Sequence, residues 1–156
     1  AHFADHTRKM RAMLIVGGLY VDIINVVPTF PKEDTACRSL STVKARGGNA
    51  ANTAVVLSNL LQHQGGASAF QVEWVGLVPS VHEPDSAFAL GALRAEHVGI
   101  SHAEAAGGSA GQPTAYILVS AATGSRTIVS TRNGLGELSC SHFEAVLGRT
   151  AEHICW

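Results

Sequence analysis

Short apolar runs separated by glycine and proline breaks recur along this chain. Met13 to Gly17 reads MLIVG, and this run predicts a buried first strand that ends in glycine. Leu19 to Val27 continues with strand-like composition, and the mixed segment 35–46 is typical of an edge or lid strand. The apolar run from Phe70 to Val78 predicts a further strand.

Three segments carry the signals of helices. Asn49 follows two glycines, and as an N-cap it predicts an apolar, largely buried helix to about Leu61. Pro84 starts a second predicted helix that runs to about His97. The sequence Ser141-His142-Phe143-Glu144 is a capping box, which predicts a third helix.

The remaining segments are turns, extended runs and a possible last strand. The β-branched runs 114–120 and 126–131 flank a turn and predict a hairpin. The Ala/Gly-rich segment 103–112 predicts a loop, and 62–68 predicts a surface insertion. Residues 153–156 resemble the first residues of another strand, so we expect the chain to be part of a longer domain.

Strands that alternate with helices favour a parallel α/β sheet flanked by helices. The extended excursions at about 20–46 and 114–131 do not fit that alternation. They predict a second, smaller β-sheet that lies as a lid over one end of the main sheet. The expected organisation is therefore a polar tail over 1–11 and one α/β unit over 12–156.

Composition excludes several classes of function. The 156 residues are 46% hydrophobic and 15% charged, and a net charge of −1 gives no electrostatic basis for binding nucleic acid or an anionic membrane. No apolar run is long enough to span a membrane, and the polar opening lacks the apolar core of a secretory signal. Three separated cysteines favour a reduced, cytoplasmic compartment. His2 and His6 have helical spacing but no third ligand, so we expect no metal site there.

The segment GGNAAN, residues 47–52, is the first candidate for chemistry. Gly47 and Gly48 allow close approach of a ligand to the backbone, while Asn49 and Asn52 lie three residues apart on the first helical turn. Amides donate and accept hydrogen bonds, which suits sugar hydroxyls. An ordinary glycine turn with an asparagine cap would leave the same pattern.

Two charged residues are the next candidates. Asp22 lies among apolar residues, and its carboxylate, near the carboxyl end of the first strand, could accept bonds from two hydroxyls. Arg126, at the base of the predicted hairpin, carries a permanent charge that suits phosphate oxygens. A solvent-facing aspartate and an exposed edge-strand arginine remain the alternatives.

Other phosphate-binding and catalytic patterns are missing. Gly17-Gly18 lacks the G-x-G-x-x-G spacing of dinucleotide sites, and no Walker A sequence occurs. No Ser/His/Asp triad can be assigned from spacing. A binding module of unrelated function stays open at this point.

Taken together and in this order, these residues resemble the ribokinase (PfkB) family of carbohydrate kinases over about residues 12–156. The resemblance rests on Gly17 with Asp22, on GGNAAN and on Ser125-Arg126-Thr127-Ile128-Val129. FPKED, residues 30–34, and RGGNA, residues 46–50, are similar to the ketohexokinase branch, and the absence of a Gly-Asp-Asp stretch after the second strand agrees with that branch.

The resemblance implies a ribokinase-like fold and ATP-dependent phosphorylation of a sugar, with fructose at C1 as the expected acceptor and Mg²⁺ accompanying the ATP. By position, Asp22, Gly48, Asn49 and Asn52 would bind the sugar and Arg126 the ATP phosphates. The lid would pair with that of a second copy in a homodimer.

The family's Gly-Ala-Gly-Asp motif, which carries the anion hole and the general base, is missing from this chain. No catalytic residue is therefore expected here, and little activity from the chain alone. Two alternatives remain: a truncated, non-catalytic isoform that pairs through its lid, and a nucleoside kinase of the same family.

Overall fold

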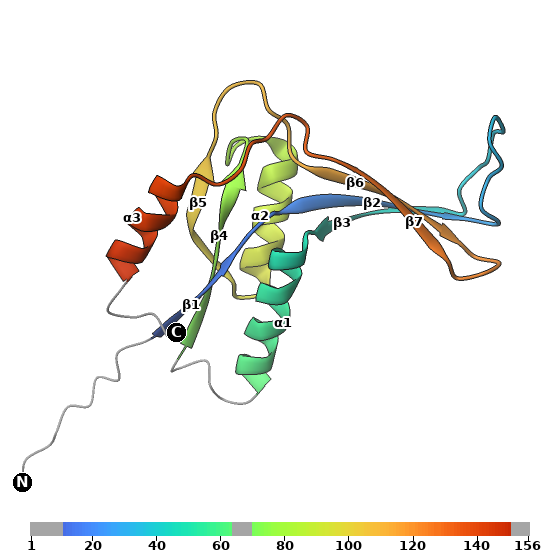
Figure 1. Cartoon of the computed structure of the whole chain (residues 1–156). Helices are drawn as coiled ribbons and strands as arrows, with labels where there is room; N and C mark the ends of the chain where they lie inside the picture. The colour runs from blue at the N-terminus through green and yellow to red at the C-terminus, as the bar shows by residue number, and fades with distance from the viewer. Residues whose placement is uncertain (1–10, 64–69, 151–156) are drawn as a thin grey trace, which may run out of the picture.

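The computed structural model describes residues 11–63 and 70–150, and it contains two separate sheets (Figure 1). The first, here called the base sheet, consists of β1 (Arg11–Val16), β4 (Phe70–Val78) and β5 (Gly99–Ala105) in the order β1-β4-β5. All of its strand pairs are parallel. This parallel sheet confirms the predicted α/β class.

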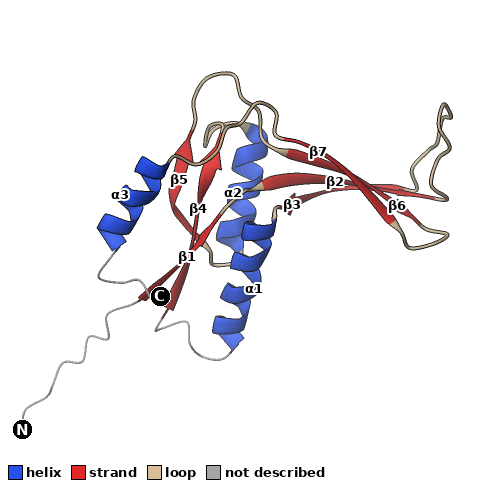
Figure 2. Cartoon of the chain, in the orientation of Figure 1, coloured by secondary structure: helices blue, strands red, loops and turns tan. Residues whose placement is uncertain are grey.

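Helices cover both faces of the base sheet (Figure 2). α1 (Asn49–His63) and α2 (Pro84–Ala95) pack on one face, where the largest buried side chain is that of Trp74 on β4. α3 (Cys140–Thr150) lies on the other face, beside β5, and its Ser139 neighbour donates a hydrogen bond to Glu104. Apolar residues from both helices, β2, β4 and the neighbouring connections complete the core: Leu19, Val21, Ala51, Ala54, Val72, Val78, Ala89, Leu90, Leu93 and Val98.

The second sheet projects away from the base, as the two right-hand hairpins of Figure 1 show. It consists of β2 (Tyr20–Val27), β3 (Ser41–Gly47), β6 (Thr114–Ser120) and β7 (Arg126–Thr131), in the order β3-β2-β6-β7. β2 and β6 are parallel, and each outer strand pairs antiparallel with its neighbour. The two excursions predicted to leave the alternating pattern therefore do build a sheet of their own.

One strand and two helix caps differ from the sequence predictions. β5 was not predicted, because its sequence GISHAEA has neither an apolar run nor regular alternation. The third helix is capped by Ser139, whose Oγ accepts a hydrogen bond from the His142 amide at 3.1 Å, and not by Ser141. Asn49 is the first residue of α1, because the Gly48 carbonyl accepts the first helical bond, from Asn52 at 2.9 Å.

Some predictions lie outside the described residues. They are the polar tail with its His2–His6 pair, most of the insertion at 62–68 and the strand at 153–156. Within the described ranges, no helix is long and apolar enough to cross a membrane. The same residues contain no cluster of three histidine, cysteine or acidic side chains arranged to hold a metal ion.

Candidate functional site

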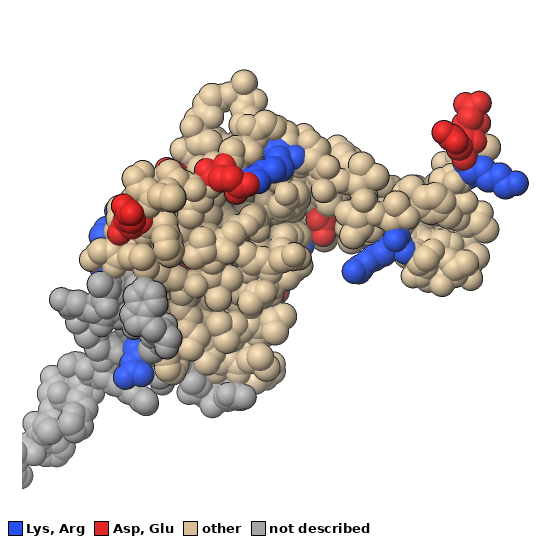
Figure 3. Space-filling view, viewed as in Figure 1, with Lys and Arg blue, Asp and Glu red and all other residues tan. Residues whose placement is uncertain are grey.

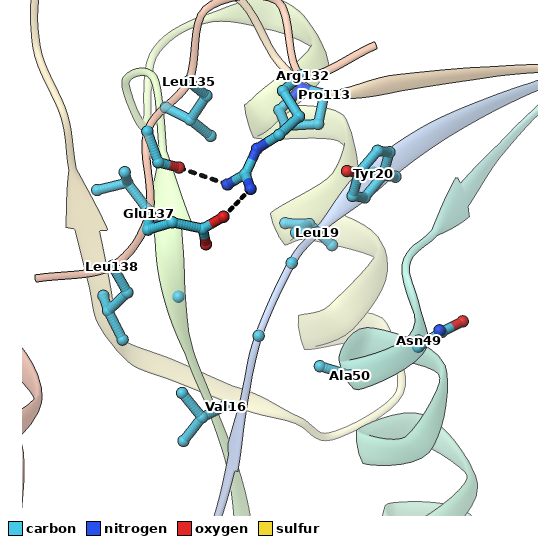
Figure 4. Close-up of a pocket in the computed structure, with 15 residues that line it drawn as sticks. Val16, Leu19, Tyr20, Asn49, Ala50, Pro113, Arg132, Leu135, Glu137 and Leu138 are labelled. Carbon is cyan, nitrogen blue, oxygen red and sulfur yellow. Dashed lines mark hydrogen bonds and ion pairs between the residues drawn. The ribbon is translucent and has the colours of Figure 1, made fainter. Parts of the chain in front are cut away.

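A pocket of about 370 Å³ opens at the carboxyl ends of β1 and β4 (Figure 4). Parallel α/β sheets bind their ligands at this end of the strands, because loops and helix N-termini converge there. Gly136 and the three strand-end glycines Gly17, Gly18 and Gly76 form part of the wall. Tight packing requires the last of them, since a Cβ on Gly76 would lie 2.5 Å from the Gly17 carbonyl oxygen.

Asp22 lies directly against the Gly-Gly segment that precedes α1. Its carboxylate occupies the space where Gly47 has no side chain: a Cβ there would come within 2.5 Å of Oδ2. The antiparallel pairing of β2 with β3 produces this contact. Tyr20 lies opposite Gly47 in the register, so Asp22, two residues further along β2, is the diagonal neighbour of Gly47. The structure therefore brings together two motifs that are 25 residues apart in the sequence.

Gly48 needs the backbone freedom of glycine. Its φ of 99° lies in a region that L-residues rarely adopt, and a Cβ would approach the Gly18 carbonyl oxygen to 2.5 Å. Because Gly48 is followed at once by α1, this close contact places Asn49 at the rim of the pocket. Figure 4 shows the Asn49 side chain turned away from Arg132.

Asn52 has a partner of its own. Its Oδ1 accepts a hydrogen bond from Arg46 Nη1 at 2.8 Å, which leaves the amide nitrogen available as a donor. Asn52 does not line the pocket at the strand ends; it borders an apolar groove along α1 with Thr53, Val56, Leu57 and Leu60.

Arg126 lies apart from the other four predicted residues. It is the first residue of β7, it is exposed, and it pairs in register with Val119 next to the turn at the outer end of the second sheet. Within the described residues the structure thus gathers Asp22, Gly48 and Asn49 around one turn, with Asn52 one helical turn further on. Arg126 does not join them in this arrangement.

The sequence analysis missed the most polar wall of the pocket. Arg132 Nη1 donates to the Glu137 carboxylate and Nη2 to the Gly136 carbonyl, and Tyr20 stands beside the same guanidinium (Figure 4). The hydrogen bond with Arg132 lowers the pKa of Glu137, so this carboxylate stays ionised and is a weak base. Two opposite charges five residues apart, in the glycine-containing loop after a hairpin, were the available signal.

The electrostatics of Asp22 differ from those of Glu137. Burial raises the pKa of the Asp22 carboxyl, and the nearby Arg46 charge opposes that rise. Burial also lowers the pKa of Arg46, against the opposing charges of Glu96 and Asp22. A partly desolvated carboxylate with unfilled acceptor capacity is a strong hydrogen-bond acceptor for hydroxyl groups.

The sequence is similar to a known enzyme family over most of its length. The family model described as pfkB family carbohydrate kinase matches residues 10–153. Mouse ketohexokinase (Mus musculus) is 36% identical over 138 residues, which are 87% of this chain and 42% of the mouse protein. The chain thus spans less than half the length of this curated relative.

Solved structures show the same fold at low sequence identity. Ribokinase from Giardia lamblia superposes with a TM-score of 0.70 at 20% identity, over 89% of this chain and 38% of that one. A putative ribokinase from Agrobacterium tumefaciens gives a TM-score of 0.66 at 20% identity, over 88% and 42%. The fold is therefore ribokinase-like.

Proposed function

Since the chain belongs to the pfkB family of carbohydrate kinases, we propose that it forms the sugar-binding part of a kinase that phosphorylates fructose at C1 with ATP. The similarity to mouse ketohexokinase supports fructose as the substrate. In this proposal Asp22, Asn49 and Asn52 bind the sugar hydroxyls, and Gly48 lets the sugar approach the backbone.

The contact between Asp22 and Gly47 is the observation that carries this proposal. A carboxylate is held against a glycine backbone, one residue from Gly48 and two from an asparagine at a helix start. This arrangement offers acceptors, amide donors and free backbone N–H groups along one short turn. A row of neighbouring hydroxyls, as on a ketohexose, presents the complementary pattern.

ATP and Mg²⁺ enter the proposal as the phosphoryl donor and its counterion. Phosphoryl transfer depends mostly on positioning and on neutralising charge, which Mg²⁺ supplies when it is bound to the phosphates. Arg126 is proposed to approach those phosphates. Glu137, the acid in the pocket, is a poor general base because the hydrogen bond from Arg132 lowers its pKa and so weakens its affinity for a proton. In this proposal the general base belongs to the family's Gly-Ala-Gly-Asp motif, which this sequence does not contain.

Direct binding of fructose to the purified chain tests the sugar site. Asp22→Asn keeps the side-chain shape and removes the charge, so we expect affinity to fall roughly 10-fold or more, as for loss of a charged hydrogen bond. Glu144→Gln, at an exposed position on α3, removes the same charge away from the site and should leave affinity unchanged. Equal affinities for the Asp22 variant and the parent would rule out the assignment.

A coupled assay with ATP and fructose tests whether the sugar-binding part has kinase activity by itself. We expect the chain alone to show no useful turnover, since the general base and nucleotide loops lie outside the proposed sugar-binding part. Clear turnover by the purified chain would contradict this. Competition with adenosine or inosine distinguishes a sugar site from a nucleoside site. A nucleoside that displaces fructose and binds more tightly than fructose would show that the substrate is a nucleoside.

We also propose that the second sheet is a lid that pairs with that of another copy. Its strands expose large apolar side chains, namely Val43, Tyr116, Ile128 and Val129. Figure 3 shows few charged side chains along this arm except near its outer end. Sedimentation should then give a dimer, and Val129→Lys should weaken it by placing two charges in the interface. A parent chain that stays monomeric at high concentration would exclude this pairing.

A further inference from the structure

Four chain segments connect the base to the second sheet within the described residues. They are 17–19 between β1 and β2, Gly48 between β3 and α1, 106–113 between β5 and β6, and 132–139 between β7 and α3. Any two sheets joined by such segments could rotate relative to one another unless the segments are tied together. What ties them here is a single side chain with its neighbours.

Gln112 is that side chain. It is 2% exposed, although an amide is costly to bury without partners. Its Nε2 donates to the Leu19 carbonyl at 2.7 Å, and its Oε1 accepts from Ser86 Oγ at 2.9 Å. The first bond reaches the β1–β2 connection and the second reaches α2, so one amide joins the base helix to the start of the second sheet.

The backbone of Gln112 is engaged as well. Its carbonyl accepts from Asn133 Nδ2 at 2.6 Å and from Thr114 Oγ1 at 3.0 Å. Asn133 belongs to the connection that leaves β7, and its amide side chain is therefore held on the β5–β6 connection. The adjacent Pro113 carbonyl accepts the Val21 amide at 2.9 Å, which fixes where β2 begins.

The remaining connection touches the same place. A Cβ on Gly48 would lie 3.3 Å from Leu19 Cα and 2.5 Å from the Gly18 carbonyl oxygen, so the β3–α1 turn is in contact with the segment that Gln112 holds. All four connections therefore meet around Leu19 and Gln112. Asp22 follows three residues after Leu19, and Asn49 follows directly after Gly48.

We propose that Gln112 is the positioning residue of the candidate sugar site: by tying Leu19 to α2 it fixes the second sheet, and with it Asp22, relative to Asn49 and Asn52. Gln112 contacts none of the proposed sugar-binding side chains, so it acts through the Leu19 backbone. This role rests on the proposed function only in naming the ligand; the fixed angle between the two sheets is independent of what binds there.

Pulsed EPR distances between the two sheets test the proposal directly. Thr127→Cys on β7 and Gln62→Cys on α1 place spin labels at exposed positions, one on each side of the connections, with the three native cysteines changed to serine. The parent should give one narrow distance distribution. Gln112→Leu keeps the size of the side chain but leaves the Leu19 carbonyl unpaired, and it should broaden the distribution about twofold.

A second variant and a matched control guard against misfolding. Gln112→Glu keeps an acceptor for Ser86 and loses the donor to Leu19, so it too should broaden the distribution while keeping a polar side chain. Thr42→Val removes a 2.7 Å hydrogen bond to Asn25 inside the second sheet and should leave the distribution narrow. Lower stability of both Gln112 variants with an unchanged distribution would mean a merely structural role and would overturn the proposal.

Fructose affinity gives the readout tied to function. We expect Gln112→Glu to bind fructose about 10-fold more weakly than the parent, and Thr42→Val to match the parent. A broadened distribution with unchanged fructose affinity would show that the tie fixes the sheets but not the site, and the positioning role would fail. If the parent itself binds no fructose, the proposed function fails, while the distance measurement still decides whether Gln112 holds the sheets together.

Discussion

The base and the second sheet both contain apolar strand residues but differ in what covers them. Trp74 in the base is fully buried, whereas Val129 in the second sheet is 65% exposed. β7 is exposed at all six of its positions, and β4 is buried at six of nine. The two helices α1 and α2 pack on the base, and α2 also contacts β3 through Lys44, but among the described residues no helix covers β7, which is exposed along its whole length.

The difference shows that strand propensity and burial are separate properties. β-branched and aromatic residues form the hairpin of β6 and β7 because cross-strand pairing needs only a neighbouring strand. Burial of their side chains needs a second layer, and the described part of the chain does not supply one over β7, which is exposed at every position. The exposed apolar side chains of the second sheet are therefore available to a ligand or a partner.

The largest difference between the two regions should appear in the stability lost when one apolar side chain is removed from each. Trp74→Ala empties the core of the base and should lower the free energy of unfolding by about 3–5 kcal/mol, mainly through the cavity left behind. At a concentration that keeps the chain monomeric, Val129→Ala removes a side chain that is mostly in water and should cost under ~0.5 kcal/mol. Chemical denaturation followed by far-UV circular dichroism measures both. Similar losses would mean that Val129 is covered in solution.

The contact between Asp22 and Gly47 joins the two regions and should show a strong coupling. Gly47→Ala introduces a methyl group that overlaps the Asp22 carboxylate, and should destabilise by about 1–3 kcal/mol. In the background of Asp22→Ala the same change should cost much less, because the overlapping atoms are gone. A double-mutant cycle in urea gives the coupling, and additive costs would show that the carboxylate lies elsewhere.

Two glycines with open space around them should respond in opposite directions. Gly91 lies within α2, and Gly91→Ala should stabilise by up to ~1 kcal/mol through helix propensity. Gly124 lies in the hairpin turn with a φ of +70°, and Gly124→Ala should destabilise by about 1 kcal/mol because alanine is strained there. Thermal melts of the two variants and the parent test this, and a shift of the same sign in both would contradict the backbone assignment.

A smaller change in stability is expected for Lys44, whose side chain joins the second sheet to the base. From β3 it forms an ion pair with Asp85 at the start of α2, and its Nζ lies 4.7 Å from the centre of the Phe88 ring. Both charged side chains are 40% exposed, so we expect Lys44→Gln to cost under ~1 kcal/mol. That cost should shrink as salt is raised. A loss that does not depend on salt would point to packing of the lysine stem instead.

The smallest expected effect is on pH dependence. Because burial raises the pKa of Asp22 above its ordinary 3.8, the folded state binds a proton there more readily than the unfolded state. The resulting stability is present below pH 3.8 and is lost as pH rises through the raised pKa. Asp22→Asn cannot titrate, so its stability relative to the parent should increase over that window, and the change should be small because Asp22 is only partly buried. A relative decrease would mean that ion pairing outweighs burial.

Local patterns predicted much of the fold. Phe70–Val78 was predicted as a strand and forms β4 with the same bounds, because nine consecutive residues carry the signal. β5 was missed because it lies at the edge of the base sheet and most of its side chains are only partly buried. Such a strand needs no regular apolar pattern. The cap of α3 is Ser139, although only Ser141 is followed three residues later by a glutamate, because the helix already begins at Cys140 and the Ser139 hydroxyl accepts the His142 amide.

The residues of the candidate site were also only partly predictable from local patterns. Asp22, Asn49 and Asn52 were recognisable from residue type and short spacing, and their roles remain predictions. Arg132 and Glu137 line the pocket through a loop whose course depends on the whole hairpin before it, so their spacing and opposite charges did not show that they reach the pocket. Gln112 carried no signal at all, since its partner Leu19 lies 93 residues away in the sequence.

The sequence by itself determined the helices, the glycine turn and every described strand except β5, because propensity, periodicity and backbone freedom act over a few neighbouring residues. Only the tertiary structure decided that Gly47 leaves room for Asp22, that the connections meet at Gln112 and that the second sheet keeps its apolar side chains in the open. These outcomes depend on which strands pair and which layer covers them, and such contacts join residues too distant in the chain for a local pattern to record.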